Sequence, residues 1–180
     1  MGKLGKMHAT FLPKLYPGIA HVICHSKTDP FDDVIDGKRV KKAASVKALL
    51  DECDVLVTTS SATKPYINPN DIRSDTYLVV NLSLMDFDLD VIKDSKCIIV
   101  DDWEQNKKAE KVFKKGVEDG SLTEANVSQF GDILFDPSIR PSDRVFINPL
   151  GMGLEDVYVA KKVADTLQRG SSGSRSHLHD

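Results

Sequence analysis

Two glycines three residues apart open the chain. Gly2 and Gly5 stand at the start of a stretch whose apolar residues recur at helical spacing. The amino end of a helix presents N–H groups without intrahelical partners, together with the positive end of the helix dipole, and both suit a phosphate. Glycine lets that phosphate approach the backbone, which a Cβ atom would block. The pair therefore matches the second and third glycines of a Gly-x-Gly-x-x-Gly dinucleotide fingerprint. A plain helix-start turn is the alternative.

A dinucleotide fingerprint also predicts an acidic residue about 20 residues later, which binds the ribose 2′-hydroxyl. The sequence has His25, Ser26 and Lys27 in that place, and the next carboxylate is Asp29. Hydroxyls and a lysine suit a 2′-phosphate better than a bare ribose diol. The pattern therefore favours NADP over NAD. The alternative is that His25 merely ends a strand and Lys27 is a solvated surface residue.

A third chemical group is the carboxylate of Asp86, which follows the strongest strand pattern of the chain, at 76–84. In open parallel sheets, ligands bind at the carboxyl ends of the strands. A carboxylate just past such an end can exchange a proton with a bound ligand. The alternative is that Asp86 caps a helix that begins near Asp88.

The glycines, the 25–27 segment and Asp86 have to be positioned by the strands and helices around them. Along the sequence, short apolar strand patterns alternate with helical patterns. This alternation predicts an α/β fold with a doubly wound, mostly parallel Rossmann-type sheet that has helices on both faces and lacks its first strand. We expect a dinucleotide-binding domain at 1–169 and a disordered Gly/Ser-rich tail at 170–180. The predicted strands are 20–25, 54–59, 76–84, 96–100 and 144–147, and the predicted helices are 4–15, 46–50, 101–117, one or two within 121–135, and 153–168.

Composition excludes several classes of function. A net charge of −3 over 180 residues gives no electrostatic case for binding nucleic acid or an anionic membrane. No apolar run is long enough to span a bilayer, and the first residues lack a secretory pattern. Cys24, Cys53 and Cys97 have no metal-like spacing, so we expect buried free thiols, no metal site and a cytoplasmic location.

Several blocks of the sequence together resemble one family. The segment from Val80 to Asp86 resembles an Asn-(x)4-Asp motif, and Gly2 and Gly5 with the helix after them resemble a nucleotide loop. The remaining blocks follow in the same order: Ser45–Thr59, Ser60–Pro65, Ile99–Asp102 and Gly151–Asp156. The resemblance is to the ornithine cyclodeaminase / mu-crystallin family, and is strongest to its branch that makes 2,3-diaminopropionate for siderophores.

The resemblance implies an enzyme that moves a hydride from the α-carbon of a small amino-acid or opine substrate to NAD or NADP and then processes the imine. Asp86 matches the family's catalytic aspartate. Relatives are about twice as long, and their other half carries substrate recognition and most of a homodimer interface. We therefore expect the nucleotide-binding part of an amino-acid or opine dehydrogenase or cyclodeaminase, with little activity alone. A non-catalytic NAD(P)-binding module of the mu-crystallin type is the alternative, and a bare scaffold is a third possibility.

The same resemblance assigns the positions that would surround the cofactor. Lys3 and Leu4 match backbone positions at the pyrophosphate, and His25 matches the usual acid. The side chains of Val80 and Leu82 are equally explained as sheet core. The other matching positions are Thr59, Ser61, Asn81, Ser83, Pro149 and Leu150.

Overall fold

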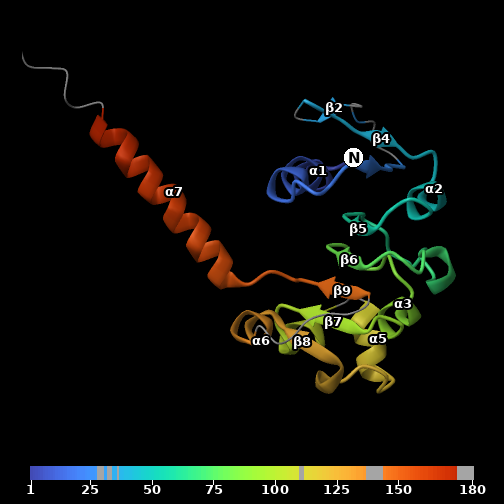
Figure 1. Cartoon of the computed structure of the whole chain (residues 1–180). Coiled ribbons are helices and arrows are strands. Elements are labelled where there is room, and N and C mark those ends of the chain that lie inside the picture. The colour runs from blue at the N-terminus through green and yellow to red at the C-terminus, as the bar shows by residue number, and fades with distance from the viewer. Residues whose placement is uncertain (28–30, 32–33, 36, 110–111, 137–143, 174–180) are drawn as a thin grey trace, which may run out of the picture. The chain divides into compact units, whose positions relative to one another are not determined.

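The computed structural model describes residues 1–27, 31, 34–35, 37–109, 112–136 and 144–173 (Figure 1). The chain divides into two compact units, Met1–Leu150 and Gly151–Asp180, which are treated separately below. None of the described helices is long and apolar enough to cross a membrane.

The first unit contains a five-stranded sheet in which every neighbouring pair is parallel. Its order is β5-β6-β9-β7-β8, so the last strand of the chain lies between two earlier ones. The predicted α/β fold with a parallel sheet is confirmed. The strands are β5 (Val55–Thr58), β6 (Leu78–Asn81), β7 (Cys97–Val100), β8 (Val127–Gln129) and β9 (Val145–Asn148).

One face of this sheet carries the hydrophobic core. Leu56, Val79, Phe146 and Ile98 lie in register across four strands, and all are buried. They pack with apolar residues of helices α2 (Val46–Leu50), α3 (Leu89–Lys93) and α5 (Val112–Glu118). On the opposite face, Val57, Val80 and Ile147 are only partly buried, whereas Ile99 is buried.

A second, smaller ladder pairs β1 (Ile23–Cys24) with β4 (Lys41–Lys42) in parallel. A hairpin of β2 (Val34–Ile35) and β3 (Lys38–Arg39) lies between them in sequence, at a stretch where no strand was predicted. Within the described residues, no ladder joins the β1–β4 pair to the five-stranded sheet.

Most helices form where the sequence predicts them, with one clear correction. Helix α1 spans Lys3–Leu15, and Ser45 caps α2 by accepting a hydrogen bond from Ala48 N at 3.1 Å. The single helix predicted at 101–117 is wrong, because α4 (Trp103–Asn106) is separate from α5. The region 121–135 forms a short 3₁₀ helix (Glu124–Asn126), the unpredicted edge strand β8 and α6 (Phe130–Phe135). Another 3₁₀ helix, Pro69–Asp71, lies at a predicted turn.

The second unit contains one helix, α7 (Gly153–Gly173). It continues past the predicted end at residue 168, so the tail predicted to begin at residue 170 is helical as far as Gly173. Residues 174–180 lie outside the described part of the chain, and the disorder predicted for them stays a prediction.

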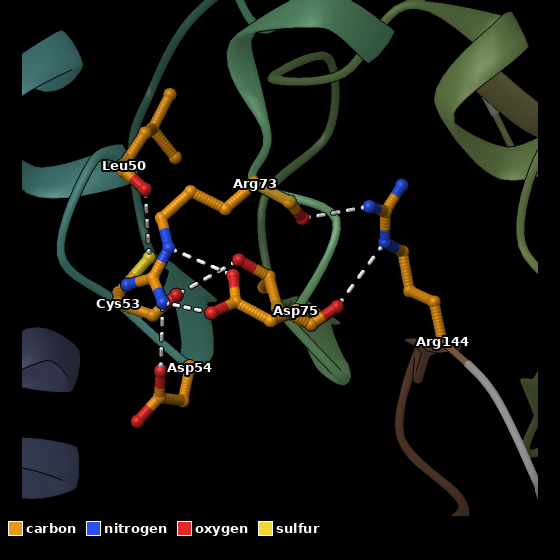
Figure 2. Close-up of polar contacts among 7 residues, drawn as sticks. Leu50, Cys53, Asp54, Arg73, Asp75 and Arg144 are labelled. Carbon is orange, nitrogen blue, oxygen red and sulfur yellow. Dashed lines mark hydrogen bonds and ion pairs between the residues drawn. The ribbon is translucent and has the colours of Figure 1, made fainter.

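Polar side chains tie the amino ends of three strands together (Figure 2). Arg144, which precedes β9, donates to the carbonyl oxygens of Arg73 and Thr76 at 2.9 and 3.2 Å. Thr76 Oγ1 donates to the carbonyl of Cys53 at 2.8 Å, and Arg73 pairs with Asp75. Each of these polar residues has a partner within the chain, which marks this end of the sheet as structural.

Candidate functional site

The amino end of α1 and the carboxyl end of β5 meet at the opposite end of the sheet, where the carboxyl ends of the strands lie. This end of the sheet is called the carboxyl edge. A Cβ atom placed on Gly5 would lie 3.1 Å from Oγ1 of Thr59, the residue that follows β5, and 2.8 Å from Cγ of Met1. A larger residue at position 5 would therefore push the helix away from the strand end. Two of the predicted cofactor residues, Gly5 and Thr59, are thus brought into contact.

The space in front of α1 is open. A Cβ atom on Gly2 would meet nothing within 4 Å, so the protein's own packing does not require glycine there. Gly2 is the N-cap residue, no side chain caps the helix, and no acidic residue lies in its first turn. The backbone N–H groups of Lys3, Leu4 and Gly5 have no acceptor within the helix. This end of α1 has the chemistry of an anion site.

Asp86 lies at this same edge and is completely buried. The Ser60 hydroxyl, two residues past β5, donates to its Oδ1. Its Oδ2 is buried and has no hydrogen-bond partner within the described residues. Its main-chain oxygen accepts hydrogen bonds from the N–H groups of Tyr66 and Ile67, each at 3.0 Å. A buried acceptor without a donor is costly, and at a strand end it marks a place where a ligand can donate.

The capping alternative for Asp86 is wrong. Helix α3 is capped by Asp88, whose carboxylate accepts a hydrogen bond from Asp90 N at 3.0 Å. Helix capping therefore does not explain why an acidic residue stands at position 86.

A chain of buried polar side chains crosses the carboxyl ends of the strands. Thr58 Oγ1 donates to Asn81 Oδ1 at 3.2 Å, and Asn81 Nδ2 donates to Asn148 Oδ1 at 2.7 Å. Asn148 Nδ2 then donates to Asn106 Oδ1 at 2.6 Å, and Asn106 Nδ2 donates to Asp101 Oδ1 at 2.8 Å. Residues from β5, β6, β9 and α4, with Asp101 just after β7, are thereby joined in one line.

Asp101 fixes the direction of every bond in this polar chain. A carboxylate accepts hydrogen bonds and cannot donate them, so Asn106 must turn its amide nitrogen towards Asp101. The amide oxygen of Asn106 then faces the nitrogen of Asn148, and the same logic orients Asn81. Asp101 Oδ2 accepts from Leu150 N at 2.6 Å, which anchors the predicted cofactor segment at Pro149 and Leu150.

The sequence analysis missed most of this polar chain. It identified Asn81, but not Thr58, Asn106 or Asn148. A usable signal was present, because β5, β6 and β9 all end in a polar residue on the buried face. Ser60 was also missed, although its N–H donates to Oγ of the predicted residue Ser83 at 2.7 Å.

The remaining predicted residues lie at the strand ends with less specific surroundings. Leu82 and Val80 are partly buried and neither belongs to the buried core cluster, while Leu82 N donates to Thr58 O at 3.1 Å. Ser61 is exposed. Within the described residues, no group of three or more His, Cys, Asp or Glu side chains could hold a metal ion.

His25, Ser26 and Lys27 follow β1, in the smaller ladder. The Nδ1 atom of His25 lies 3.1 Å from the carbonyl oxygen of Ala43, and this contact requires the proton on Nδ1. In the neutral ring, Nε2 is then an acceptor, while Lys27 is exposed.

Comparison with known proteins extends these observations. No family model matches the chain. A curated relative, N-((2S)-2-amino-2-carboxyethyl)-L-glutamate dehydrogenase of Staphylococcus aureus, is 24% identical over 139 residues, which cover 75% of this chain and 41% of the relative. The chain therefore spans less than half the length of the curated relative that it matches.

Solved structures show the same fold. CmnK matches with a TM-score of 0.81 at 24% identity, over 94% of this chain and 53% of its own. A probable ornithine cyclodeaminase from Bordetella pertussis has a TM-score of 0.71 at 21% identity, over 88% of this chain and 54% of its own. The Thermococcus litoralis Δ1-pyrroline-2-carboxylate reductase, solved with NADH and L-proline, has a TM-score of 0.65 at 17% identity, over 74% and 44%.

The parallel sheet with its polar carboxyl edge defines an α/β protein of the Rossmann type. The sequence relation to the staphylococcal enzyme, with the ordered motifs from Gly2 to Asp156, makes the chain similar to proteins of the ornithine cyclodeaminase / mu-crystallin family.

Proposed function

We propose that this chain is the nicotinamide-dinucleotide-binding part of an enzyme that oxidises, reduces or cyclises a small amino acid or opine. The observation that carries the proposal is the meeting of Gly5 with Thr59 at the strand edge where Asp86 keeps a buried, unpartnered oxygen. The named activity of the staphylococcal relative and the NADH and L-proline of the archaeal one support this substrate class.

The residues at this edge fit such a cofactor. The first N–H groups of α1 would hold the pyrophosphate, and the open space at Gly2 leaves room for it. Thr59, Ser61 and the strand end Val80–Ser83 would flank the nucleotide, and Pro149 and Leu150 would lie beside it. The bound nicotinamide supplies the hydride chemistry. Asp86 would accept or return the proton that leaves or joins the substrate amine.

The cofactor we favour is NADP. Lys27 is exposed at the turn after β1, and Nε2 of His25 is not engaged by the contact that Nδ1 makes. A positive charge and polar atoms in that turn complement a 2′-phosphate, whereas the carboxylate that selects a ribose diol does not follow β1 directly.

Fluorescence titration with NADPH and NADH tests cofactor binding. We expect saturable binding, and we expect Gly2→Val to weaken it by about tenfold or more, because the side chain projects into the phosphate space. Gly18→Val is the matched control, since a Cβ atom there also meets nothing within 4 Å. Both variants should keep the wild-type melting temperature. Absence of binding to wild type at millimolar cofactor would contradict the proposal.

One observation favours the non-catalytic alternative, a binding module of the mu-crystallin type. Asp86 is 0% exposed, so it does not reach a ligand directly in this conformation. If the chain binds NAD(P)H and yet a panel of amino acids and cyclic imines gives no change in its absorbance, the module is the better description.

A further inference from the structure

The burial of Asp86 prevents it from exchanging a proton directly with a ligand in this conformation. Asp86 is completely buried, while Ser60, whose hydroxyl donates to its Oδ1, is exposed. A ligand on the open side of this edge therefore meets the Ser60 hydroxyl before it meets the carboxylate.

Ser60 is itself held in a defined position. Its N–H donates to Ser83 Oγ at 2.7 Å, and its Oγ accepts a hydrogen bond from Ala62 N at 3.0 Å. Because Oγ accepts from Ala62, the hydroxyl hydrogen is free to be directed at Asp86. The second lone pair of Oγ can accept from the Tyr66 phenol or from a donor on the ligand side.

Tyr66 belongs to the same group. Its N–H donates to the main-chain oxygen of Asp86 at 3.0 Å, and its side chain is 41% exposed. The pKa of Tyr66 is raised, first by burial, then by the negative charge of Asp86 and also by a side-chain hydrogen bond with Asp86, while a hydrogen bond with Ser60 lowers it. The pKa of the Tyr66 phenol therefore depends on both Ser60 and Asp86, and its titration can be used to follow changes in their hydrogen bond.

We propose that Ser60 is the proton relay of Asp86, a role that rests on the proposed function of this site. A bound amine or water gives a proton to Ser60 Oγ while Ser60 passes its own hydrogen to Asp86 Oδ1. One N–H or O–H bond of the ligand breaks, the Oγ–H bond is replaced, and an Oδ1–H bond forms. Ser60 ends unchanged, Asp86 becomes neutral, and the charge of the ligand falls by one. No other reactant is needed.

Tyrosine labelled with ¹³C at Cζ allows a test in the whole chain without cofactor. The Tyr66 resonance is identified by its loss in Tyr66→Phe, and its pH titration is followed by NMR. Removing the Ser60 donor in Ser60→Ala should raise the Tyr66 titration midpoint by about half a pH unit or more, the size expected for one hydrogen bond to a charged oxygen. Ser60→Thr should restore the wild-type midpoint, and Ser61→Ala, at the adjacent exposed serine, should not move it.

The coupling between Ser60 and Asp86 is the decisive measurement. Asp86→Asn should lower the Tyr66 midpoint because it removes the negative charge, and Ser60→Ala should then have a different effect in that background. Ser60→Cys, which keeps the size but donates weakly, replaces Ser60→Ala if the latter does not fold. Equal midpoints in wild type and the Ser60 variants, or strictly additive shifts, would overturn the relay. Since no cofactor is present, this result is independent of whether NAD(P)H binds.

Discussion

At the scale of single residues, two buried aspartates at one sheet edge differ in how their oxygens are satisfied. Asp101 accepts from Asn106 and Asp102 N through Oδ1 and from Leu150 N through Oδ2, so its role is fully accounted for within the protein. Asp86 has one oxygen bonded by Ser60 and the other without a donor. The number of partners, which sequence does not contain, separates a structural carboxylate from one available to a ligand.

The choice between NADP and NAD can be tested at Lys27. If its ammonium group contacts a 2′-phosphate, Lys27→Ala should weaken NADPH binding by about two- to fivefold, as for an exposed ion pair, and leave NADH binding unchanged. Lys115→Ala, at another exposed lysine, is the control. Equal weakening of both cofactors would assign Lys27 no part in discrimination.

The three cysteines allow a prediction about thiol reactivity. Burial raises the pKa values of Cys24, Cys53 and Cys97, so less thiolate is present at pH 8 than in a free thiol. We expect iodoacetamide to react with Cys24 and Cys53 at least about tenfold more slowly in the folded chain than in urea, as measured by mass spectrometry. Because the unfolded chain releases these protons first, stability should fall only as the pH rises above about 9. Equal rates in the folded and unfolded chain would contradict this.

At the scale of elements, the sequence predicts those strands that form because of their own residue pattern. The apolar runs that became β5, β6, β7 and β9 were found because buried parallel strands are continuously apolar. Strands β8 (Val127–Gln129) and β4 (Lys41–Lys42) were not predicted, because they are short edge strands with polar or charged residues. Such strands form through pairing with a neighbouring strand. The Asp36-Gly37 pair between β2 and β3 is a hairpin signal that was not used.

The residues of the candidate site also fall into two groups, those that the sequence predicts and those that it does not. Gly5 was predicted from motif spacing, Asp86 from its place after a predicted strand and from the resemblance, and Thr59 and Asn81 from the resemblance alone. The structure places all four at the carboxyl ends of the strands. The partners that hold them in place come from elements distant in sequence. Asn148, for example, lies 67 residues from Asn81, and only the insertion of β9 beside β6 brings their amides together.

The polar chain that joins the strand ends predicts the effect of one isosteric change. Asn148→Asp would turn a carboxylate oxygen towards Asn106 Oδ1 and bury a charge with no donor on that side. We expect a loss of about 2–4 kcal/mol in the free energy of unfolding at pH 7, from urea denaturation. Asn70→Asp is the control, because Asn70 is exposed. A loss no larger than that of the control would show that the chain of amides contributes little to stability.

At the scale of the whole molecule, each of the two units has a helix with exposed apolar residues. Leu4, Met7, Phe11 and Leu15 of α1 are each at least half exposed, although they form the apolar stripe of an amphipathic helix. Apolar stripes of this size are usually covered in a complete protein. The chain spans 53% of CmnK and 41% of the staphylococcal relative, so about half of the corresponding architecture lies outside this sequence.

Helix α7 permits a direct test of whether its apolar stripe drives association. Val157 and Leu167 are 66% and 67% exposed and lie on one side of a helix of 21 residues. Such a helix gains most of its stability in water by burying that side against a partner. We expect the chain to self-associate at tens of micromolar in sedimentation velocity, and Val157→Glu with Leu167→Glu to shift it towards monomer. Lys162→Glu, which changes the net charge by the same two units on the polar side, should leave the association as in wild type. If the control variant shifts the chain towards monomer as much as the double variant does, net charge rather than the apolar stripe controls association.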